Sequence, residues 1–534
     1  MTAESSASPA QQIAAGYTTS GQALNLGAVV VDGVVDASAQ VRIPLATINR
    51  HGLIAGATGT GKTKTLQVIA EQLSAAGVPV VMADVKGDLS GLAQAGAAND
   101  KTAQRAIDTG DDWAPTAFPV EFLSLGTTGV GVPVRATVTS FGPILLSKVL
   151  GLNQTQESTL GLVFHWADQK GLLLLDLKDL RAVIQYLISD EGKPELKTLG
   201  AVSPATAGVI LRALVNLEAE GADTFFGEPE LKPEDLMRVD QQGRGIITLL
   251  ELGSQAARPV MFSTFLMWVL ADLFTALPEI GDADKPKLVF FFDEAHLLFT
   301  DASKAFLAQV EQTVKLIRSK GVGVFFCTQL PTDIPNDVLS QLGARVQHAI
   351  RAFTPDDQKA LTRTVRTYPK TTVYDLESAL TSLGIGEAVV TVLSEVGAPT
   401  PVAWTRLRAP RSLMDTIGTD AITAAAKASP LQAVYGQTID RDSAYERLAA
   451  KLGLPGAPTG DGTAPAGAPD AAPVPEPVDE PEIRASGRAQ VETDGPGVVQ
   501  EVLQSTAFKS FLRSAATVAG REITRSLFGT ARRK

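Results

Sequence analysis

Short runs of consecutive apolar residues recur along the chain and alternate with segments of helical periodicity. Seven such runs are rich in Val, Ile and Phe, at residues 53–55, 78–83, 120–125, 246–250, 288–292, 322–327 and 388–393. Runs that are apolar at every position are typical of strands buried on both faces of a parallel sheet. The pattern therefore predicts an α/β fold with a mainly parallel sheet.

The pattern becomes helical in the middle of the chain. Within residues 141–235, apolar positions recur every three or four residues in the segments 154–169, 176–189 and 205–220. This is the period of amphipathic helices, so we predict a helical insertion between two parts of the α/β core. Residues 63–76, directly after the first strand, have a helical pattern too.

Two segments bear on membrane insertion, and neither fits it. Residues 260–277 are the most apolar stretch, but Ser263, Thr264 and Asp272 interrupt it, whereas a membrane span needs about 20 mainly apolar residues. We predict a buried helix there. Residues 1–17 lack the basic and apolar regions of a signal peptide, and we expect them to form a loose arm.

The composition changes near the end of the chain. Residues 454–497 contain nine prolines and eight acidic residues but two basic ones, so they cannot bury enough apolar surface to fold and are predicted to be a disordered linker. Residues 498–534 have a stripe of apolar positions, with seven basic residues against two acidic ones. This pattern predicts a basic amphipathic helix, which usually has a docking partner.

Composition limits the class of protein. The 534 residues are 45% hydrophobic and 20% charged, which is ample for a large globular core. The single cysteine, Cys327, cannot form an internal disulfide, and four scattered histidines offer no structural zinc site. Both observations favour a reducing compartment, so we expect a cytoplasmic protein. The net charge of -11 argues against coating of nucleic acid by the whole surface, but leaves a local basic channel open.

The most specific motif is a P-loop, G-x-x-x-x-G-K-[ST], formed by Gly56, Ala57, Thr58, Gly59, Thr60, Gly61, Lys62 and Thr63. Its glycines let successive backbone N–H groups turn toward phosphate oxygens at the positive end of the following helix. Lys62 is expected to reach the β- and γ-phosphates of ATP, and the Thr63 hydroxyl to ligate Mg²⁺. A glycine turn with a chance lysine is the alternative, and the flanking strand and helix argue against it.

A second motif places two carboxylates, Asp293 and Glu294, after the apolar run 288–292. Asp293 is expected to hold Mg²⁺, and Glu294 to orient or activate a water for in-line attack on the γ-phosphate. Such a pair also occurs as an N-cap or first-turn charge of a helix, but its combination with a P-loop favours the catalytic role. A dedicated water-positioning glutamate indicates a hydrolase rather than a kinase, which must exclude water.

Polar residues end two other strands. Gln329 follows the run 322–327, and its amide could hydrogen-bond both the γ-phosphate and the attacking water, or merely end the strand. Asp84 follows the run 78–83, at the kind of sheet edge where open α/β sheets bind ligands. It could support the metal or the water, although Asp is also common in plain turns.

One arginine is a candidate for stabilising the charge of the transition state. Arg318 ends the helix that begins near Ala302, and could reach a nucleotide. As a cation at a helix C-terminus it could equally complement the helix dipole. Arg345 and Arg351 are weaker candidates for the same role.

Together these motifs resemble the HerA and FtsK superfamily of P-loop ATPases, and most closely its bacterial YjgR-like HerA branch. The similar segments fall within residues 49–410 and are 49–63, 83–91, 293–296 and 318–331. The ending is also similar to that branch, at residues 507–511 and 519–522.

The resemblance implies a RecA-like core that assembles as a homo-oligomer, a hexameric ring with ATP sites at subunit boundaries. It implies hydrolysis of ATP with Mg²⁺, coupled to translocation of double-stranded DNA, and a nuclease or other protein as partner. Members carry an arginine one helix after the acidic pair, where Arg318 stands, and an acidic residue after the second strand, where Asp84 stands.

With this resemblance, the chain divides into seven parts. They are an N-terminal arm with leading strands (1–45), the first part of the RecA-like ATPase core (46–140), the helical insertion (141–235), the second part of the core (236–410), a helical extension (411–453), the linker (454–497) and the terminal helix (498–534).

Departures from the superfamily leave two other hypotheses open. About 45 residues precede the segment 49–63, too few for the β-barrel of archaeal HerA, and neither membrane helices nor a DNA-reading winged helix is visible. The chain could therefore be an ATPase that remodels a protein or other polymer. It could also be a nonhydrolysing nucleotide switch whose terminal helix binds a membrane, a partner or its own core.

Overall fold

The computed structural model describes residues 7–84, 87–127, 129–196, 202–251, 259–281 and 283–452. The predicted linker 454–497 and the predicted helix 498–534 lie outside the described residues. Both remain predictions.

A single sheet of twelve strands forms the centre of the described part of the chain. Its spatial order is β2 (Val34–Pro44), β1 (Ala23–Val31), β12 (Ala403–Leu407), β11 (Glu387–Thr391), β10 (Ala344–Gln347), β3 (Gly52–Ala55), β9 (Val322–Thr328), β8 (Leu288–Phe292), β4 (Val80–Asp84), β7 (Ile247–Glu251), β5 (Val120–Leu125) and β6 (Val132–Val134). All neighbours from β10 to β6 pair in parallel, and those from β2 to β10 pair antiparallel. The predicted α/β class and mainly parallel sheet are thereby confirmed.

Each of the seven predicted strands is present, with ends that differ by at most two residues. The strands that the pattern missed are short or mixed in character. β10 carries Arg345 and Gln347 among its four residues, and β12 alternates buried with half-buried positions. Such sequences become strands because their neighbours pair with them, since tertiary context overrides a weak local preference.

Two apolar cores lie on opposite faces of the sheet, because alternate residues of each strand point to opposite sides. Ile54 packs with Leu66 of α2 (Lys62–Ala75) in one core. Leu53 belongs to the other core, with Phe265 of α8 (Pro259–Ala276) and Phe306 of α10 (Lys304–Ile317). The central strands are thus covered on both faces, which explains their uninterrupted apolar sequence.

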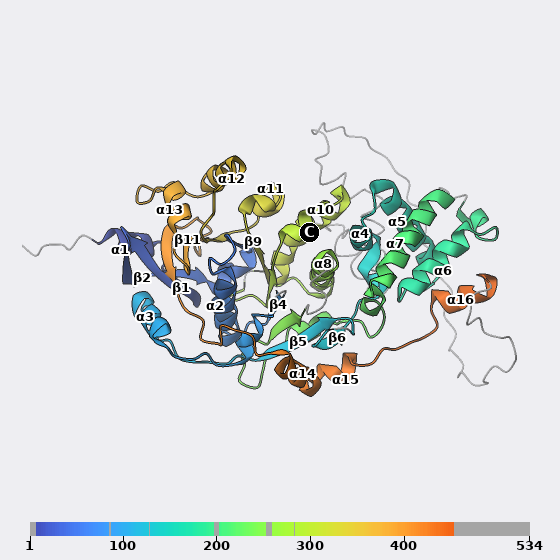
Figure 1. Ribbon diagram of the computed structural model, residues 1–534, viewed down its shortest axis with the longest axis horizontal. Helices are drawn as coiled ribbons and strands as arrows, with labels where there is room; N and C mark the ends of the chain where they lie inside the picture. The colour runs from blue at the N-terminus through green and yellow to red at the C-terminus, as the bar shows by residue number, and fades with distance from the viewer. Residues whose placement is uncertain are drawn as a thin grey trace, which may run out of the picture.

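The helical segment between β6 and β7 gathers at one end of the molecule (Figure 1). It contains α4 (Val138–Val149), α5 (Gln154–Gln169), α6 (Leu177–Ile188) and α7 (Pro204–Ala219), and the three helices predicted there agree to within one residue. Capping explains the starts of two of them, because the Asn153 and Asp176 side chains accept hydrogen bonds from backbone N–H groups at the starts of α5 and α6. The proposed division into domains stays a prediction.

The remaining helices pack around the sheet or, for α16, against the helical insertion. They are α3 (Asp100–Thr109), α9 (His296–Phe299), α11 (Asn336–Leu339), α12 (Pro355–Val365), α13 (Leu376–Ser382), α14 (Thr419–Ala428), α15 (Leu431–Tyr435) and α16 (Ala444–Leu452). Figure 1 shows α14 and α15 beside β5 and β6, and α16 beside α6. None of the helices within the described residues has the length and apolar character needed to cross a membrane.

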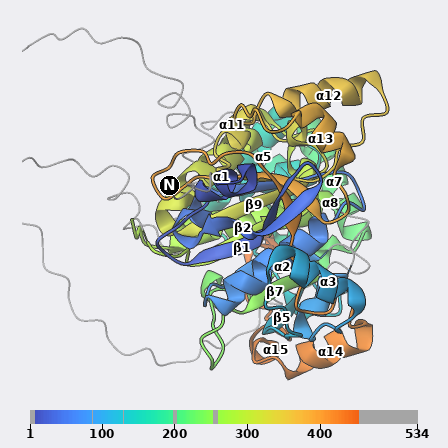
Figure 2. The ribbon, with the colours of Figure 1, turned by 90° about the vertical axis from the view of Figure 1, so that its left-hand side faces the viewer.

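The expectation of a loose N-terminal arm is wrong for the described residues. Pro9–Ala15 forms a helix, α1, that begins with a capping box between Ser8 and Gln11 and lies beside β1 and β2 (Figure 2). Ile13 and Tyr17 are buried, and the Tyr17 hydroxyl donates a hydrogen bond to the Val390 carbonyl at 2.8 Å. A helix of seven residues is too short to show a clear period, so its order comes from this packing rather than from local propensity.

Candidate active site

The P-loop joins β3 to α2 at the carboxyl edge of the sheet. Gly59 and Gly61 have φ values of 80° and 113°, which favour glycine because other residues meet steric strain there. Gly61 caps the N-terminus of α2, so the N–H groups of the loop point where an anion would be bound at the positive end of the helix.

Neighbouring strands hold this loop in place. The Gly56 N–H donates to the Thr328 carbonyl at the end of β9, at 3.2 Å, and the Ala57 N–H donates to the Ala349 carbonyl after β10, at 2.9 Å. On the other side of the loop, the Gly386 N–H donates to the Thr60 carbonyl at 3.1 Å. The loop is therefore fixed before any phosphate binds, which lowers the entropy lost on binding.

Lys62 and Thr63 lie at the start of α2, where both side chains are half-buried. The Lys62 ammonium donates to the Gly56 carbonyl at 2.6 Å and to the Ala57 carbonyl at 3.2 Å. The ammonium thus lies against the P-loop, where the motif predicts that phosphate binds. Thr58 and Gly59 are exposed, so the loop is accessible from solvent.

Asp293 and Glu294 follow β8, which only β9 separates from the P-loop strand. The turn is fixed by a hydrogen bond from the Ala295 N–H to the Cys327 carbonyl at 2.8 Å. Glu294 has a φ of 47°, a left-handed conformation that costs a residue with a side chain about 1–2 kcal/mol. Such strain persists where the surroundings impose it, often at active sites. The Glu294 carboxylate lies 3.4 Å from Nδ1 of His296.

Cys327 connects the two motifs, a role the sequence did not indicate. Its thiol is buried at the end of β9, and burial together with the nearby Asp293 carboxylate raises its pKa well above the usual value. The charges of Lys62 and Glu294 also act on this thiol. The P-loop lysine and both carboxylates are therefore close together in the fold. An apolar run that ends in cysteine gave no sign of this, because buried cysteine is ordinarily a small hydrophobic residue.

Gln329 lies at the same edge, directly after β9, with an exposed side chain. Asp333 fixes the backbone around it, because its carboxylate accepts hydrogen bonds from the Thr328 hydroxyl at 2.7 Å and from the Leu330 N–H at 2.9 Å. The position beside the P-loop is compatible with the predicted sensor role, which stays a prediction.

Asp84 ends β4 at this edge but serves the backbone of the following turn. Its buried carboxylate accepts hydrogen bonds from the N–H groups of Gly87 at 2.7 Å, Leu89 at 3.0 Å and Ser90 at 3.1 Å. This is the turn alternative that the sequence left open, and the carboxylate has little capacity left for a metal or a water. Its proposed catalytic role is the least favoured among the candidate residues.

Glu251 pairs with Asp84 across β4 and β7 and was not among the predicted site residues. Burial, together with the charge of Asp84, raises the pKa of Glu251 to about 8. A carboxylate directly after the apolar run 246–250 is the same signal that singled out Asp84, so this residue could have been found.

His348 is a second residue that the sequence analysis missed. It follows β10 beneath the P-loop, and its Nε2 lies 2.9 Å from the Thr65 hydroxyl of α2. A Cβ atom at Gly56 would lie 2.5 Å from the His348 Cβ, so only glycine at position 56 lets the loop pack this closely against His348. Burial, together with the nearby Lys62 charge, lowers the pKa of His348 to about 4. His348 is therefore a neutral support for the loop at physiological pH.

Arg318 lies at the opposite edge of the sheet from the P-loop. It precedes β9, whose seven residues separate the two edges by roughly 20 Å at about 3.3 Å per residue. Within one chain, Arg318 is thus not gathered with Lys62 and Glu294. Arg345, in β10, donates to the Thr367 carbonyl at 3.1 Å near the same amino edge, whereas Arg351 follows β10 at the P-loop edge and is exposed.

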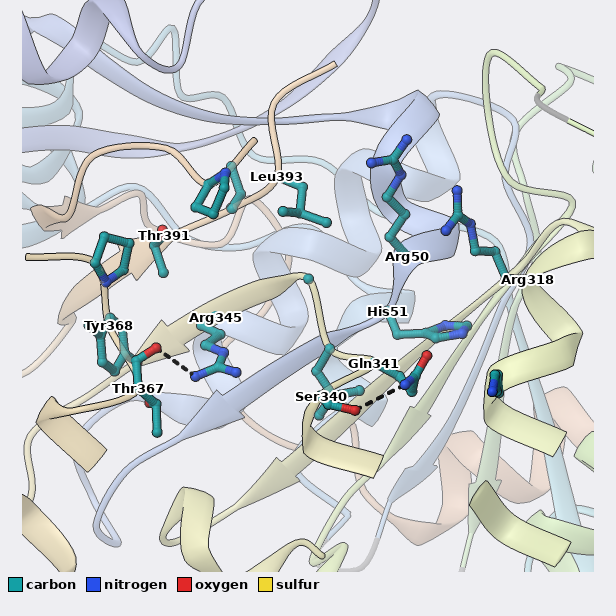
Figure 3. Close-up of a pocket in the computed structure, with 16 residues that line it drawn as sticks. Arg50, His51, Arg318, Ser340, Gln341, Arg345, Thr367, Tyr368, Thr391 and Leu393 are labelled. Atoms are coloured by element: carbon teal, nitrogen blue, oxygen red, sulfur yellow. Dashed lines mark hydrogen bonds between the residues drawn. The ribbon is translucent and has the colours of Figure 1, made fainter. Parts of the chain in front are cut away.

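A cavity of about 960 Å³ opens at this amino edge (Figure 3). We call it the cation pocket, because four basic residues and no acidic one line it: Arg50, Lys315, Arg318 and Arg345. Among the described residues, none of these four has a carboxylate within ion-pair distance. His51 forms part of the wall and is neutral, because burial lowers its pKa to about 4.

Residues 31–534 match the family described as Helicase HerA-like C-terminal. The chain belongs to this family. Membership, together with the P-loop and the acidic pair at one sheet edge, makes this HerA-like chain a P-loop ATPase and confirms the resemblance found in its sequence. No curated protein sequence matches it.

Solved structures with a similar chain path include two forms of a bacterial conjugative coupling protein. The HerA-like chain is 15% identical to TrwBΔN70, with a TM-score of 0.49, over 76% of this chain and 94% of that one. It is 16% identical to TrwB in complex with ADP and Mg²⁺, with a TM-score of 0.47, over 75% of this chain and 99% of that one. It is 15% identical to VirB4 of Thermoanaerobacter pseudethanolicus, with a TM-score of 0.44, over 73% of this chain and 98% of that one.

Proposed function

We propose that this HerA-like chain is an ATP-driven motor that works as a hexameric ring and translocates double-stranded DNA. The observation that carries the proposal is the gathering of Lys62, Asp293, Glu294 and Gln329 at one edge of the sheet, around the P-loop. This is the set of groups that phosphoryl transfer to water requires.

Binding of ATP begins with the P-loop. Its N–H groups and the Lys62 ammonium surround the phosphates, and the ammonium exchanges its contacts with the Gly56 and Ala57 carbonyls for phosphate oxygens. Thr63 and Asp293 offer hydroxyl and carboxylate oxygens, which suit Mg²⁺, an ion that usually takes few protein ligands besides phosphate and water. When bound, Mg²⁺ neutralises charge that develops on the phosphates.

Hydrolysis then depends on Glu294. Its carboxylate follows β8 at the same sheet edge as the P-loop, where it orients a water and accepts its proton as the water attacks the γ-phosphate. Gln329 extends from the neighbouring strand end and can donate its amide N–H to the γ-phosphate and accept from the same water. The turnover is that of an ATPase, because the attacking group is water.

The position of Arg318 supports the proposed ring. In one chain this arginine is a strand length away from the P-loop, so it can reach a nucleotide only if a second copy presents its carboxyl edge to the cation pocket. An interface between unlike edges is heterologous, and a heterologous interface forms a ring when its rotation closes. Arg50 lines the same pocket and would add a second positive charge at that boundary.

The experiment that tests the proposal is steady-state ATP hydrolysis with and without linear double-stranded DNA, at low and moderate salt. Glu294→Gln serves as the blank. We expect DNA to stimulate turnover and salt to weaken that effect, because counterion release drives DNA binding. Turnover that ignores DNA at low salt would remove DNA as the substrate and direct the search toward a protein. Absence of turnover would favour a nucleotide switch.

A further inference from the structure

We propose that the cation pocket is a binding site for an acidic peptide, and that its ligand is the segment 476–482 of this same chain. The pocket concentrates positive charge without compensation. Lys315 and Arg318 are exposed, Arg50 and Arg345 are half-buried, and all four line one cavity. Mutual repulsion of these groups favours binding of an anion there.

The chain contains a sequence of complementary charge. Residues 476–482 read EPVDEPE, in which Glu476, Asp479, Glu480 and Glu482 supply four carboxylates, and the first basic residue after them is Arg484. The number of carboxylates equals the number of cations in the pocket. Arginine pairs with carboxylates through two parallel hydrogen bonds, which gives such a contact directional preference as well as charge.

The rest of the pocket suits a peptide. Besides its cations, it is lined by hydroxyl, amide and apolar groups of Ser340, Gln341, Thr367, Leu393 and Pro399, and a volume of about 960 Å³ is at the upper end for ligand cavities. His51 adds no charge, because both ring nitrogens are used: Nδ1 accepts from the Val324 N–H at 3.0 Å, and Nε2 lies 2.7 Å from the Val314 carbonyl.

A tether of 23 residues, 453–475, joins the described part of the chain to the segment. The described part of the chain ends at Leu452, and the residues up to Glu476 can extend over about 75 Å at about 3.3 Å per residue. A compact domain of this size has a radius of gyration of about 22 Å. Tethering makes the contact intramolecular, with an effective concentration set by the length of the tether.

The consequence for turnover rests on the proposed function. The segment and the phosphates of a neighbouring nucleotide are both anions, and both need Arg318. The segment therefore competes with the neighbouring nucleotide for this arginine, and its removal from the pocket raises ATP hydrolysis. The binding itself depends only on the pocket and the segment.

The first test measures binding in full-length protein. A variant with Glu476→Gln, Asp479→Asn, Glu480→Gln and Glu482→Gln leaves the pocket free, and a fluorescein-labelled peptide of residues 474–483 reports binding by anisotropy at low salt. We expect the peptide to bind this variant at least about tenfold more tightly than wild type, where the tethered segment competes. A peptide with the four acidic residues neutralised is the matched control ligand.

Pocket variants locate the site. Added to the neutralised chain, Lys315→Glu should weaken peptide binding at least about tenfold, whereas Lys427→Gln, an exposed lysine of α14, should not change it. Lys315→Gln, a milder change at an exposed side chain, checks that any loss comes from charge and not from misfolding. Equal binding to wild type, the neutralised chain and the Lys315 variants overturns the proposal. Preference for duplex DNA over the peptide at this pocket also overturns it.

The second test compares ATP hydrolysis by wild type and by the neutralised chain. A several-fold higher rate in the neutralised chain supports competition for Arg318. If neither chain hydrolyses ATP, the proposed function fails while the binding measurement still decides the pocket. If both hydrolyse it equally although the peptide binds, the regulatory part of the proposal is wrong.

Discussion

The two edges of the parallel strands carry opposite chemistry. At the carboxyl edge are the P-loop and two carboxylates, and the charges of Lys62, Asp293 and Glu294 all act on the Cys327 thiol. At the amino edge are four basic side chains around a cavity. Parallel strands enforce the separation, because every connection from a strand to the next helix leaves at the carboxyl edge and every return arrives at the amino edge.

In the proposed function, one chain therefore holds two unlike halves of a site. The carboxyl edge has groups that bind phosphate and activate water, and Arg318 at the other edge cannot reach them within the chain. A ring in which unlike edges meet would bring the halves together. Changing one edge at a time tests this division of roles.

The largest effects are expected at the carboxyl edge. Glu294→Gln should lower ATP turnover about 10²–10⁴-fold with little loss of ATP affinity, because only the water-activating carboxylate is removed. Lys62→Ala should weaken ATP binding about 10–100-fold, because it removes a charged contact to phosphate. Turnover and nucleotide titration of both variants separate the two roles.

Asp293→Asn serves as a comparison. Because it removes an expected ligand of Mg²⁺, it should lower turnover and raise the Mg²⁺ concentration at which turnover is half-maximal. Equal loss of ATP binding in the Glu294 and Lys62 variants would contradict the division of roles between them.

The next largest effect is expected at the amino edge. Arg318→Ala should lower the turnover number by up to about 10³-fold, with a smaller change in KM, if the arginine stabilises transition-state charge at a neighbour's nucleotide. An equal mixture of Lys62→Ala and Arg318→Ala chains should regain activity. About a quarter of the boundaries in random rings combine an intact P-loop with an intact arginine.

Mixing wild type with each single variant gives the control for subunit exchange. Unchanged turnover in Arg318→Ala would remove this arginine from the site, and failure of the exchanged mixture to recover any activity would argue against action across a boundary.

The smallest effect concerns stability near the carboxyl edge. Glu251 has its folded pKa raised to about 8, so the folded state holds this proton more tightly than the unfolded state, and the resulting stability is lost as pH rises from about 4.5 through 8. Glu251→Gln should therefore gain in Tm over wild type across this range, by a few degrees at pH 8.5, at about 2–4 °C per kcal/mol. Thermal unfolding at pH 4.5 and 8.5 measures the gain.

Glu279→Gln, at an exposed position, is the matched control and should show no such pH dependence. A Glu251→Gln gain that is equal at both pH values would mean that its origin is packing rather than titration.

The central strands and the P-loop could be predicted from the sequence, because each depends on contiguous residues of the chain. The central strands could be read because burial on both faces demands an apolar residue at every position. The P-loop could be read because phosphate binding needs glycines and a lysine within eight contiguous residues. β10 and β12 were not predicted, because their polar residues are tolerated in strands only through pairing with neighbours. α1 was not predicted either, because its seven residues depend on packing against β1 and β2.

The α/β class, the P-loop and the acidic pair could be predicted from sequence alone, since each depends on neighbouring residues in the chain. Only the tertiary structure decided that Asp84 serves a turn, that Cys327 and His348 support the phosphate edge, and that Arg318 faces away from it. These facts depend on residues brought together from distant segments. Arg50 and Arg318 are far apart in sequence, and it is the parallel pairing of their strands that places them in one pocket.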